Sequence, residues 1–73
     1  MLLAQKIKVH RLKKKYSQQY MAEKLDISQN AYSKIERGKT DLTVKRMLEI
    51  AAILEVSAVM LLPWKPRSMD RFI

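Results

Sequence analysis

The segment over residues 17–39 constrains the fold most, because it holds two short helical patterns with only a two-residue gap between them. Ser17 and Ser28 each stand where an N-cap is expected, since a serine hydroxyl accepts a hydrogen bond from the first backbone N–H groups of a helix. Gly38 follows the second pattern, and glycine commonly ends helices. The segment therefore predicts two helices joined by a tight turn, over residues 17–25 and 28–37.

Helices of this length are not stable alone, so they must pack on each other and on neighbouring elements. Such a pair is a helix-turn-helix arrangement. Elsewhere apolar residues recur at intervals of three and four, and the chain has only one Gly and two Pro. We therefore expect an all-α bundle of five helices in residues 1–62, followed by a short C-terminal tail in residues 63–73. The other three helices are predicted over residues 2–14, 44–54 and 58–62.

The net charge of +8 on 73 residues is the strongest compositional indication of function. Such a surplus favours a polyanionic partner, either nucleic acid or an acidic membrane surface. The charge is uneven, because the first fifteen residues carry six basic residues and no acid. A solvated basic helix that only improves solubility is the alternative explanation.

The chain lacks the residues that several classes of function need. The chain has no cysteine and a single histidine, His10, so we expect no metal and no cofactor. It has no glycine-rich phosphate loop and no paired acids, so we expect no enzyme. RNA binding is disfavoured, because no row of aromatic residues is available for stacking on bases. No apolar run has the length of a membrane span or of a signal peptide, which predicts a cytoplasmic protein without a membrane partner. If the polyanionic partner is DNA, the protein would be associated with the nucleoid.

The chain resembles the phage repressor and Cro type of helix-turn-helix domain, the XRE family, from Ile7 to Leu62. The motifs that carry the resemblance are Ser17-Gln18, Ala22-Glu23-Lys24-Leu25, Ile27-Ser28-Gln29, Ile35-Glu36-Arg37-Gly38-Lys39, Leu48 through Leu54 and Val56-Ser57. The resemblance implies a lambda-repressor-like bundle in which the second helix of the motif lies in the major groove of DNA.

The resemblance also implies which residues touch DNA. Base readout is expected from Gln29, Asn30, Ser33 and Lys34. Gln29 and Asn30 directly follow the N-cap, and their amides can pair bidentately with adenine, while Lys34 can reach guanine. The alternative is that polar residues on an exposed helix need no ligand. Phosphate contacts, which set the register on DNA, are expected from Gln18, Tyr32, Arg37, Lys39 and Thr40.

Two further features follow from the resemblance. Arg11 and Glu36 match a pair that forms an internal ion pair in some members, so each would leave a stranded charge if the other were removed. The sequence also departs from the family pattern, with non-glycine residues at three positions that are often glycine: Lys15, Asp26 and Glu55. Leu42 stands where proline is frequent, and His10 where an aliphatic residue is common. None of these changes removes a DNA-contacting group.

One such domain reads few base pairs, so a homodimer on two half-sites about one helical turn apart is expected. The predicted dimer or partner surface is more apolar than one short helix needs: Val59, Met60, Leu61, Leu62 and Trp64. The alternative is that these residues only close a small core. We therefore predict a transcriptional repressor that binds specific double-stranded DNA. The alternative function is an antitoxin that binds a toxin protein through this surface and represses its own operon.

Overall fold

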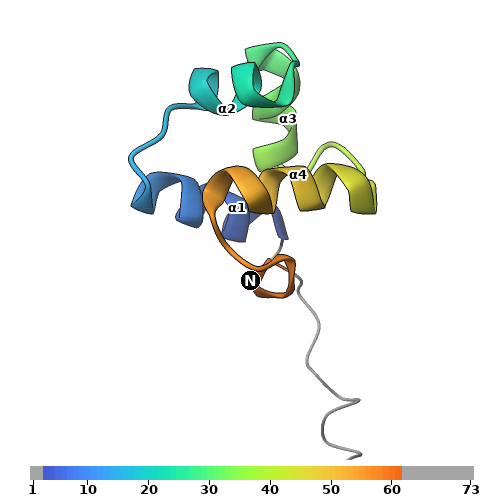
Figure 1. Ribbon diagram of the computed structural model, residues 1–73. Helices are drawn as coiled ribbons and strands as arrows, with labels where there is room; N and C mark the ends of the chain where they lie inside the picture. Colours follow the sequence, from blue (N-terminus) through green and yellow to red (C-terminus); the bar gives the residue numbers. More distant parts are fainter. Residues whose placement is uncertain (1–2, 62–73) are drawn as a thin grey trace, which may run out of the picture.

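The computed structural model describes residues 3–61, and this part of the chain is helical without strands (Figure 1). The prediction of an all-α fold is therefore confirmed. The elements are α1 (Leu3–Lys13), α2 (Gln18–Leu25), α3 (Gln29–Glu36), α4 (Val44–Leu54) and the short 3-10 helix η1 (Ala58–Met60). A fifth α-helix is not confirmed, because the described residues in this region form only η1, while residues 62–73 lie outside the described part of the chain.

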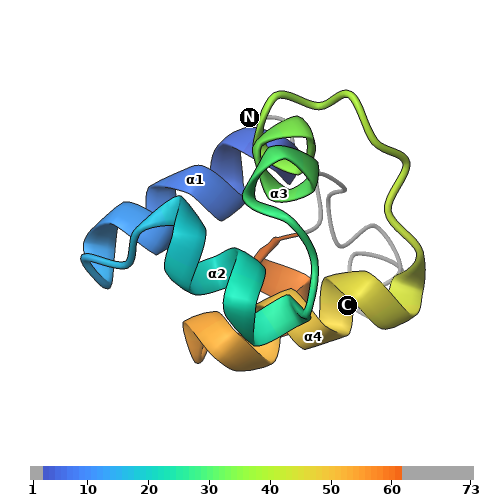
Figure 2. The same ribbon diagram turned by 90° about the horizontal axis from the view of Figure 1, so that it is seen from above.

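The helices are arranged in two levels. In Figure 1, α2 and α3 lie at the top, α1 and α4 pass beneath them, and η1 lies below α4. Seen from above, α3 is viewed nearly along its axis, with α1 and α2 to one side of it and α4 in the lower part of the view (Figure 2). The helix α2 packs against α3 and α4, α1 packs against α3 and α4, and η1 packs against α4. Every helix thus contributes to one core between the two levels.

The core draws apolar residues from all four α-helices and from the residue after η1. Its fully buried large side chains are Ile7, Met21, Tyr32, Ile50, Leu54 and Leu61. The prediction of Leu61 as a dimer or partner contact is therefore wrong. The Leu61 N–H donates to the carbonyl of Ala58, which ends η1, and the Leu61 side chain is buried in the core instead of facing solvent.

The helices begin at the residues that the sequence predicts as N-caps. The hydroxyl of Ser17 accepts a hydrogen bond from the Tyr20 N–H at 2.9 Å, and that of Ser28 accepts one from the Ala31 N–H at 3.0 Å. Thr43 caps α4 in the same way. These contacts satisfy N–H groups that have no partner within the helix. The predicted starts of α2, α3 and α4 are therefore confirmed.

The four α-helices also end alike, each followed by one residue with a left-handed backbone. The φ angles are 62° at Lys15, 59° at Asp26, 73° at Gly38 and 59° at Glu55. In each case the next residue donates its N–H to a carbonyl in the last turn of the helix, as Ile27 does to Ala22 at 3.0 Å. This is the Schellman motif, which favours glycine because other residues have a Cβ that clashes in this conformation. Three of the four ends thus carry backbone strain.

We expect Asp26→Gly to raise the free energy of unfolding by about 0.5 to 1 kcal/mol, because glycine adopts the left-handed conformation without a steric cost. Urea denaturation followed by circular dichroism measures the change. Asp41→Gly is the matched control, since Asp41 is also an exposed aspartate but has no positive φ. The control should be no more stable than the wild-type protein. Equal stability of the two variants would contradict the assignment of strain to Asp26.

Candidate nucleic-acid interface

The helix α3 is held by one face and exposed on the other. Tyr32, Ile35 and Glu36 are buried on its inner face, and Met21 and Leu25 of α2 are buried against the same core. The turn between the helices is stabilised by Ile27, whose half-buried side chain packs against the core. The exposed residues of α3, Gln29, Asn30 and Lys34, are therefore on its outer face.

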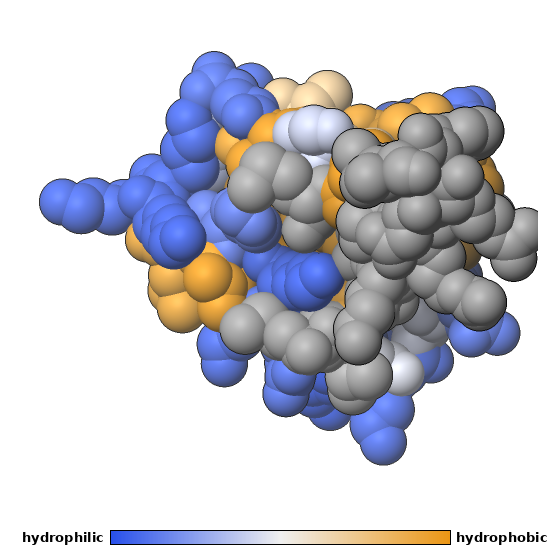
Figure 3. Space-filling model, turned by 90° about the horizontal axis from the view of Figure 1, so that it is seen from below, coloured by the Kyte–Doolittle hydropathy of each residue, from blue (hydrophilic) through white to orange (hydrophobic). Residues whose placement is uncertain are grey.

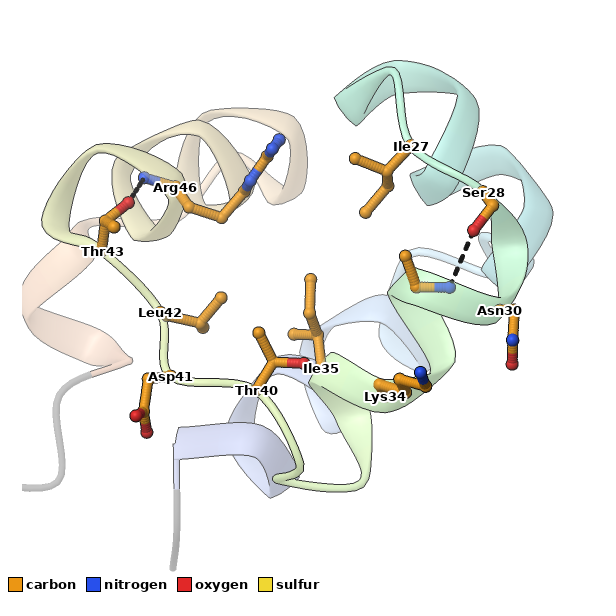
Figure 4. A pocket seen from close by; sticks show the side chains of 11 residues that line it. Ile27, Ser28, Asn30, Lys34, Ile35, Thr40, Asp41, Leu42, Thr43 and Arg46 are labelled. Atoms are coloured by element: carbon orange, nitrogen blue, oxygen red, sulfur yellow. Dashed lines mark hydrogen bonds between the residues drawn. The ribbon is translucent and has the colours of Figure 1, made fainter.

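The predicted base-reading residues lie on this outer face. Gln29, Asn30 and Lys34 are exposed, and Ser33 is half-buried. Figure 4 shows Asn30 and Lys34 directed away from the side of α3 that carries Ile35. The face thus presents two amides, a hydroxyl and an ammonium group, which are donors and acceptors suited to base edges. The structure brings these four residues together on one surface.

The predicted phosphate-binding residues flank α3 on two sides. Arg37, Lys39 and Thr40 are exposed in the segment that connects α3 to α4, and this segment runs beside α3 in Figure 2. Gln18 is the first residue of α2, where backbone N–H groups have no helical partner. Its side-chain amide donates to Glu36 at 3.1 Å and is half-buried. A contact from Gln18 to phosphate would thus use its backbone N–H or the second N–H of its side-chain amide.

Beneath this surface, the carboxylate of Glu36 joins three helices. The Arg11 Nε donates to Oε2 at 2.6 Å and Nη2 donates to Oε1 at 3.1 Å, which forms the two-pronged ion pair between α1 and α3. The Tyr32 hydroxyl donates to Oε2 at 2.5 Å, and Gln18 of α2 donates to Oε1. The carboxylate therefore accepts four hydrogen bonds, two on each oxygen. Arg11 also donates to the carbonyl of Tyr16 at 2.8 Å.

These contacts decide the charge state of the groups. Burial by itself would raise the pKa of Glu36, but the hydrogen bonds from Arg11, Tyr32 and Gln18 outweigh it and hold that pKa below its usual value. The hydrogen bond with Glu36 raises the pKa of Arg11. Burial, followed by the hydrogen bond to Glu36, raises the pKa of Tyr32 far above its usual value. Glu36 is therefore ionised and Tyr32 remains a hydrogen-bond donor.

The prediction that Tyr32 contacts phosphate is wrong. Its side chain is completely buried, and its hydroxyl is occupied by Glu36 one turn along the same helix. A buried phenol needs an acceptor, and the nearby carboxylate supplies a charged one. The spacing of four residues between Tyr32 and Glu36 is the sequence feature that indicates this contact. Tyr32 is thus a core residue that orients α3.

A groove of about 410 Å³ lies between α3, the connecting segment and the start of α4 (Figure 4). Ile27, Ile35 and Leu42 point toward its middle. At its edge, Arg46 donates to the carbonyl of Leu25 at 3.1 Å and pairs with Glu49 at 3.2 Å. Arg46 therefore joins α4 to the end of α2. Sequence reasoning missed the groove, because it forms only when residues from three elements come together.

Within residues 3–61, no helix is long and apolar enough to cross a membrane. The same residues hold no group of three or more histidine, cysteine, aspartate or glutamate side chains placed to bind a metal ion.

A polar exposed helix, fixed across a second helix by a short turn, defines a helix-turn-helix module for DNA. A helix-turn-helix family model matches residues 7–61 of the chain. A solved structure described as a hypothetical transcription factor, NHTF from Neisseria, is 25% identical and superimposes with a TM-score of 0.77. The match covers 97% of this chain and 80% of that chain. Among curated proteins, none matches. The chain belongs to the XRE-type helix-turn-helix family of DNA-binding transcriptional regulators.

We expect Tyr32→Phe to lower the free energy of unfolding by about 1 to 3 kcal/mol, because the variant loses a buried hydrogen bond to a charged group. Urea denaturation measures the loss. Tyr20→Phe is the matched control, since Tyr20 is half-buried and does not contact Glu36, and it should change stability by less than about 0.5 kcal/mol.

The pH dependence gives a second test of the same contact. The lowered pKa of Glu36 contributes stability above the usual glutamate pKa, and this is lost as the pH falls through the lowered pKa. The difference in stability between wild-type protein and Tyr32→Phe should therefore shrink in acid. A difference that is constant with pH would show that Tyr32 acts through packing alone.

Proposed function

We propose that the protein is a sequence-specific repressor of transcription that binds double-stranded DNA as a homodimer, with α3 in the major groove. The observation that carries this proposal is the outer face of α3, where two adjacent amides and a lysine are exposed on a helix whose other face is buried. The net charge of +8 supports a polyanionic partner. The description of the Neisseria protein as a transcription factor supports the same class of function.

Base readout in this proposal depends on the first two turns of α3. Gln29 and Asn30 each offer a donor and an acceptor, which together match N6 and N7 of adenine. Lys34 lies one turn beyond Asn30 and can donate to O6 or N7 of guanine. Ser33 lies between them and can donate or accept. These residues would supply the sequence preference of the protein.

Phosphate contacts on both sides of α3 would set the register without reading the sequence. On one side stands Gln18 at the start of α2. On the other side stand Arg37, Lys39 and Thr40 in the connecting segment. Contacts on two sides hold a helix in the groove, because each contact prevents the helix from tilting about the other.

We expect the double variant Gln29→Ala, Asn30→Ala to lose most of the preference for the operator, since each base contact contributes about 1 to 3 kcal/mol of discrimination. The preferred duplex would first be selected from random sequences, and competition binding then compares it with an unrelated duplex. The matched control is Lys39→Ala, which should weaken binding to both duplexes alike and reduce the salt slope by about 0.9. Unchanged operator preference in the double variant would contradict the assignment of α3.

The proposed dimer surface includes Val59 of η1, whose side chain is 61% exposed. Figure 3 shows other apolar side chains on the face opposite to α2 and α3. Of the other predicted contacts, Leu61 lies in the core, while Leu62, Trp64 and the side chain of Met60 lie outside the described residues. The antitoxin alternative depends on the same surface, and no observation in residues 3–61 favours it over a homodimer.

We expect the wild-type protein to sediment as a dimer at micromolar concentration and Val59→Ser to shift the equilibrium toward monomer, because the variant removes apolar area from the interface. Leu12→Ser is the matched control, since Leu12 is similarly exposed but lies on α1, and it should remain dimeric. A wild-type protein that is monomeric both with and without DNA would contradict the homodimer.

A further inference from the structure

Lys15 and Asp26 are the two strained helix ends whose side chains make no hydrogen bond or ion pair within residues 3–61, and lysine tolerates the left-handed backbone less well than aspartate. Gly38 has no Cβ, and aspartate, as at Asp26, tolerates a left-handed backbone better than most residues. Glu55 forms an ion pair with Lys14, which joins the end of α4 to the end of α1. Lys15 has a φ of 62° and an exposed side chain. Within residues 3–61 its ammonium group makes no hydrogen bond or ion pair.

Strained non-glycine residues often mark functional sites, where a side chain is retained in spite of its steric cost. A glycine at this position would support the same Schellman motif, in which the Lys15 N–H donates to Leu12 at 3.0 Å. The side chain of Lys15 therefore contributes nothing to the end of α1 that glycine would not also provide. The exposed ammonium group of Lys15 is therefore available to a ligand outside the folded chain.

The backbone around Lys15 is fixed relative to the start of α2. The N–H of Tyr16 donates to the carbonyl of Arg11 at 3.1 Å, and the Tyr16 carbonyl accepts from Arg11 Nη1 at 2.8 Å. The same guanidinium binds Glu36, which in turn accepts from Gln18. Lys15 thus stands three residues before Gln18 in a turn that the buried network holds in place.

We propose that Lys15 is a further DNA-binding residue, whose ammonium group contacts a backbone phosphate next to the one that Gln18 contacts. The inference rests on the proposed DNA binding of α2 and α3, and it extends the contacted surface to the turn between α1 and α2. A lysine suits this role because it is a compact charge on a flexible stem, and a phosphate contact needs no base-specific geometry.

Neighbouring lysines do not have the same placement. Lys14 is occupied by Glu55. Lys13 is the last residue of α1 and is exposed. It follows Arg11 by two residues, which places it on about the opposite side of the helix from the arginine that binds α3. Lys13 therefore provides a matched position where the same charge can be removed.

The test compares Lys15→Gly, Lys15→Gln and Lys13→Gln, which all lose one positive charge. Affinity for a random-sequence duplex is measured from about 50 to about 200 mM salt, and the melting temperature is measured without DNA. In both Lys15 variants the slope of log affinity against log salt concentration should be smaller in magnitude by about 0.9. Over this salt range the wild-type protein should therefore lose about 3.5-fold more affinity than either variant. Lys15→Gly should also melt higher, by on the order of 5 °C, because its strain is relieved. Lys13→Gln should have the wild-type slope.

Two results would overturn the inference while leaving the proposed function intact. One is a wild-type slope in both Lys15 variants. The other is an equal reduction of the slope in Lys13→Gln, which would assign the effect to net charge and not to position. A wild-type protein that shows no salt-dependent binding to any duplex would instead overturn the proposed function, and the inference with it.

Discussion

The ion pair between Arg11 and Glu36 is the contact on which the rest of the structure depends. It joins α1 to α3, and through Tyr16 and Gln18 it also fixes the turn before α2 and the first residue of α2. A buried ion pair is costly unless every donor and acceptor is satisfied. In residues 3–61 no buried side-chain nitrogen or oxygen lacks a partner, so this network meets that condition. The orientation of α3 follows from it, because both Tyr32 and Glu36 hold the helix from its inner face.

The ion pairs of the chain also show which charges have a structural partner and which are available to a ligand. Arg11 and Glu36 neutralise each other in the interior, while Lys14 pairs with Glu55 and Arg46 with Glu49. Lys15, Lys34, Arg37 and Lys39, which lie in or beside the helix-turn-helix motif, are exposed and form no ion pair within residues 3–61. The number of unpaired cations near the motif is therefore a better indication of DNA binding than the net charge.

Helix ends show how local stability and function are balanced in this chain. All four α-helices close with a left-handed residue, yet only Gly38 adopts that conformation without strain. The carboxylate of Glu55 forms an exposed ion pair with Lys14. The strained residues lie at the ends of helices, where a side chain reaches solvent or a neighbouring helix and the regular hydrogen bonds are already complete. Side chains at these positions can therefore serve contacts that glycine cannot make.

The sequence by itself determined the helical class and the starts of α2, α3 and α4, because caps and helical periodicity depend on residues within one or two turns. The outward face of α3 was implied by the family resemblance. The pairing of Arg11 with Glu36 was reached through the family resemblance. Only the tertiary structure decided that Tyr32 is a core residue and that Leu61 is buried and does not lie at an interface. It also decided how Leu42 and Arg46 border the groove beside α3. Burial depends on residues far apart in the chain, so a local pattern identifies an apolar or amphipathic side chain but not the elements that will cover it.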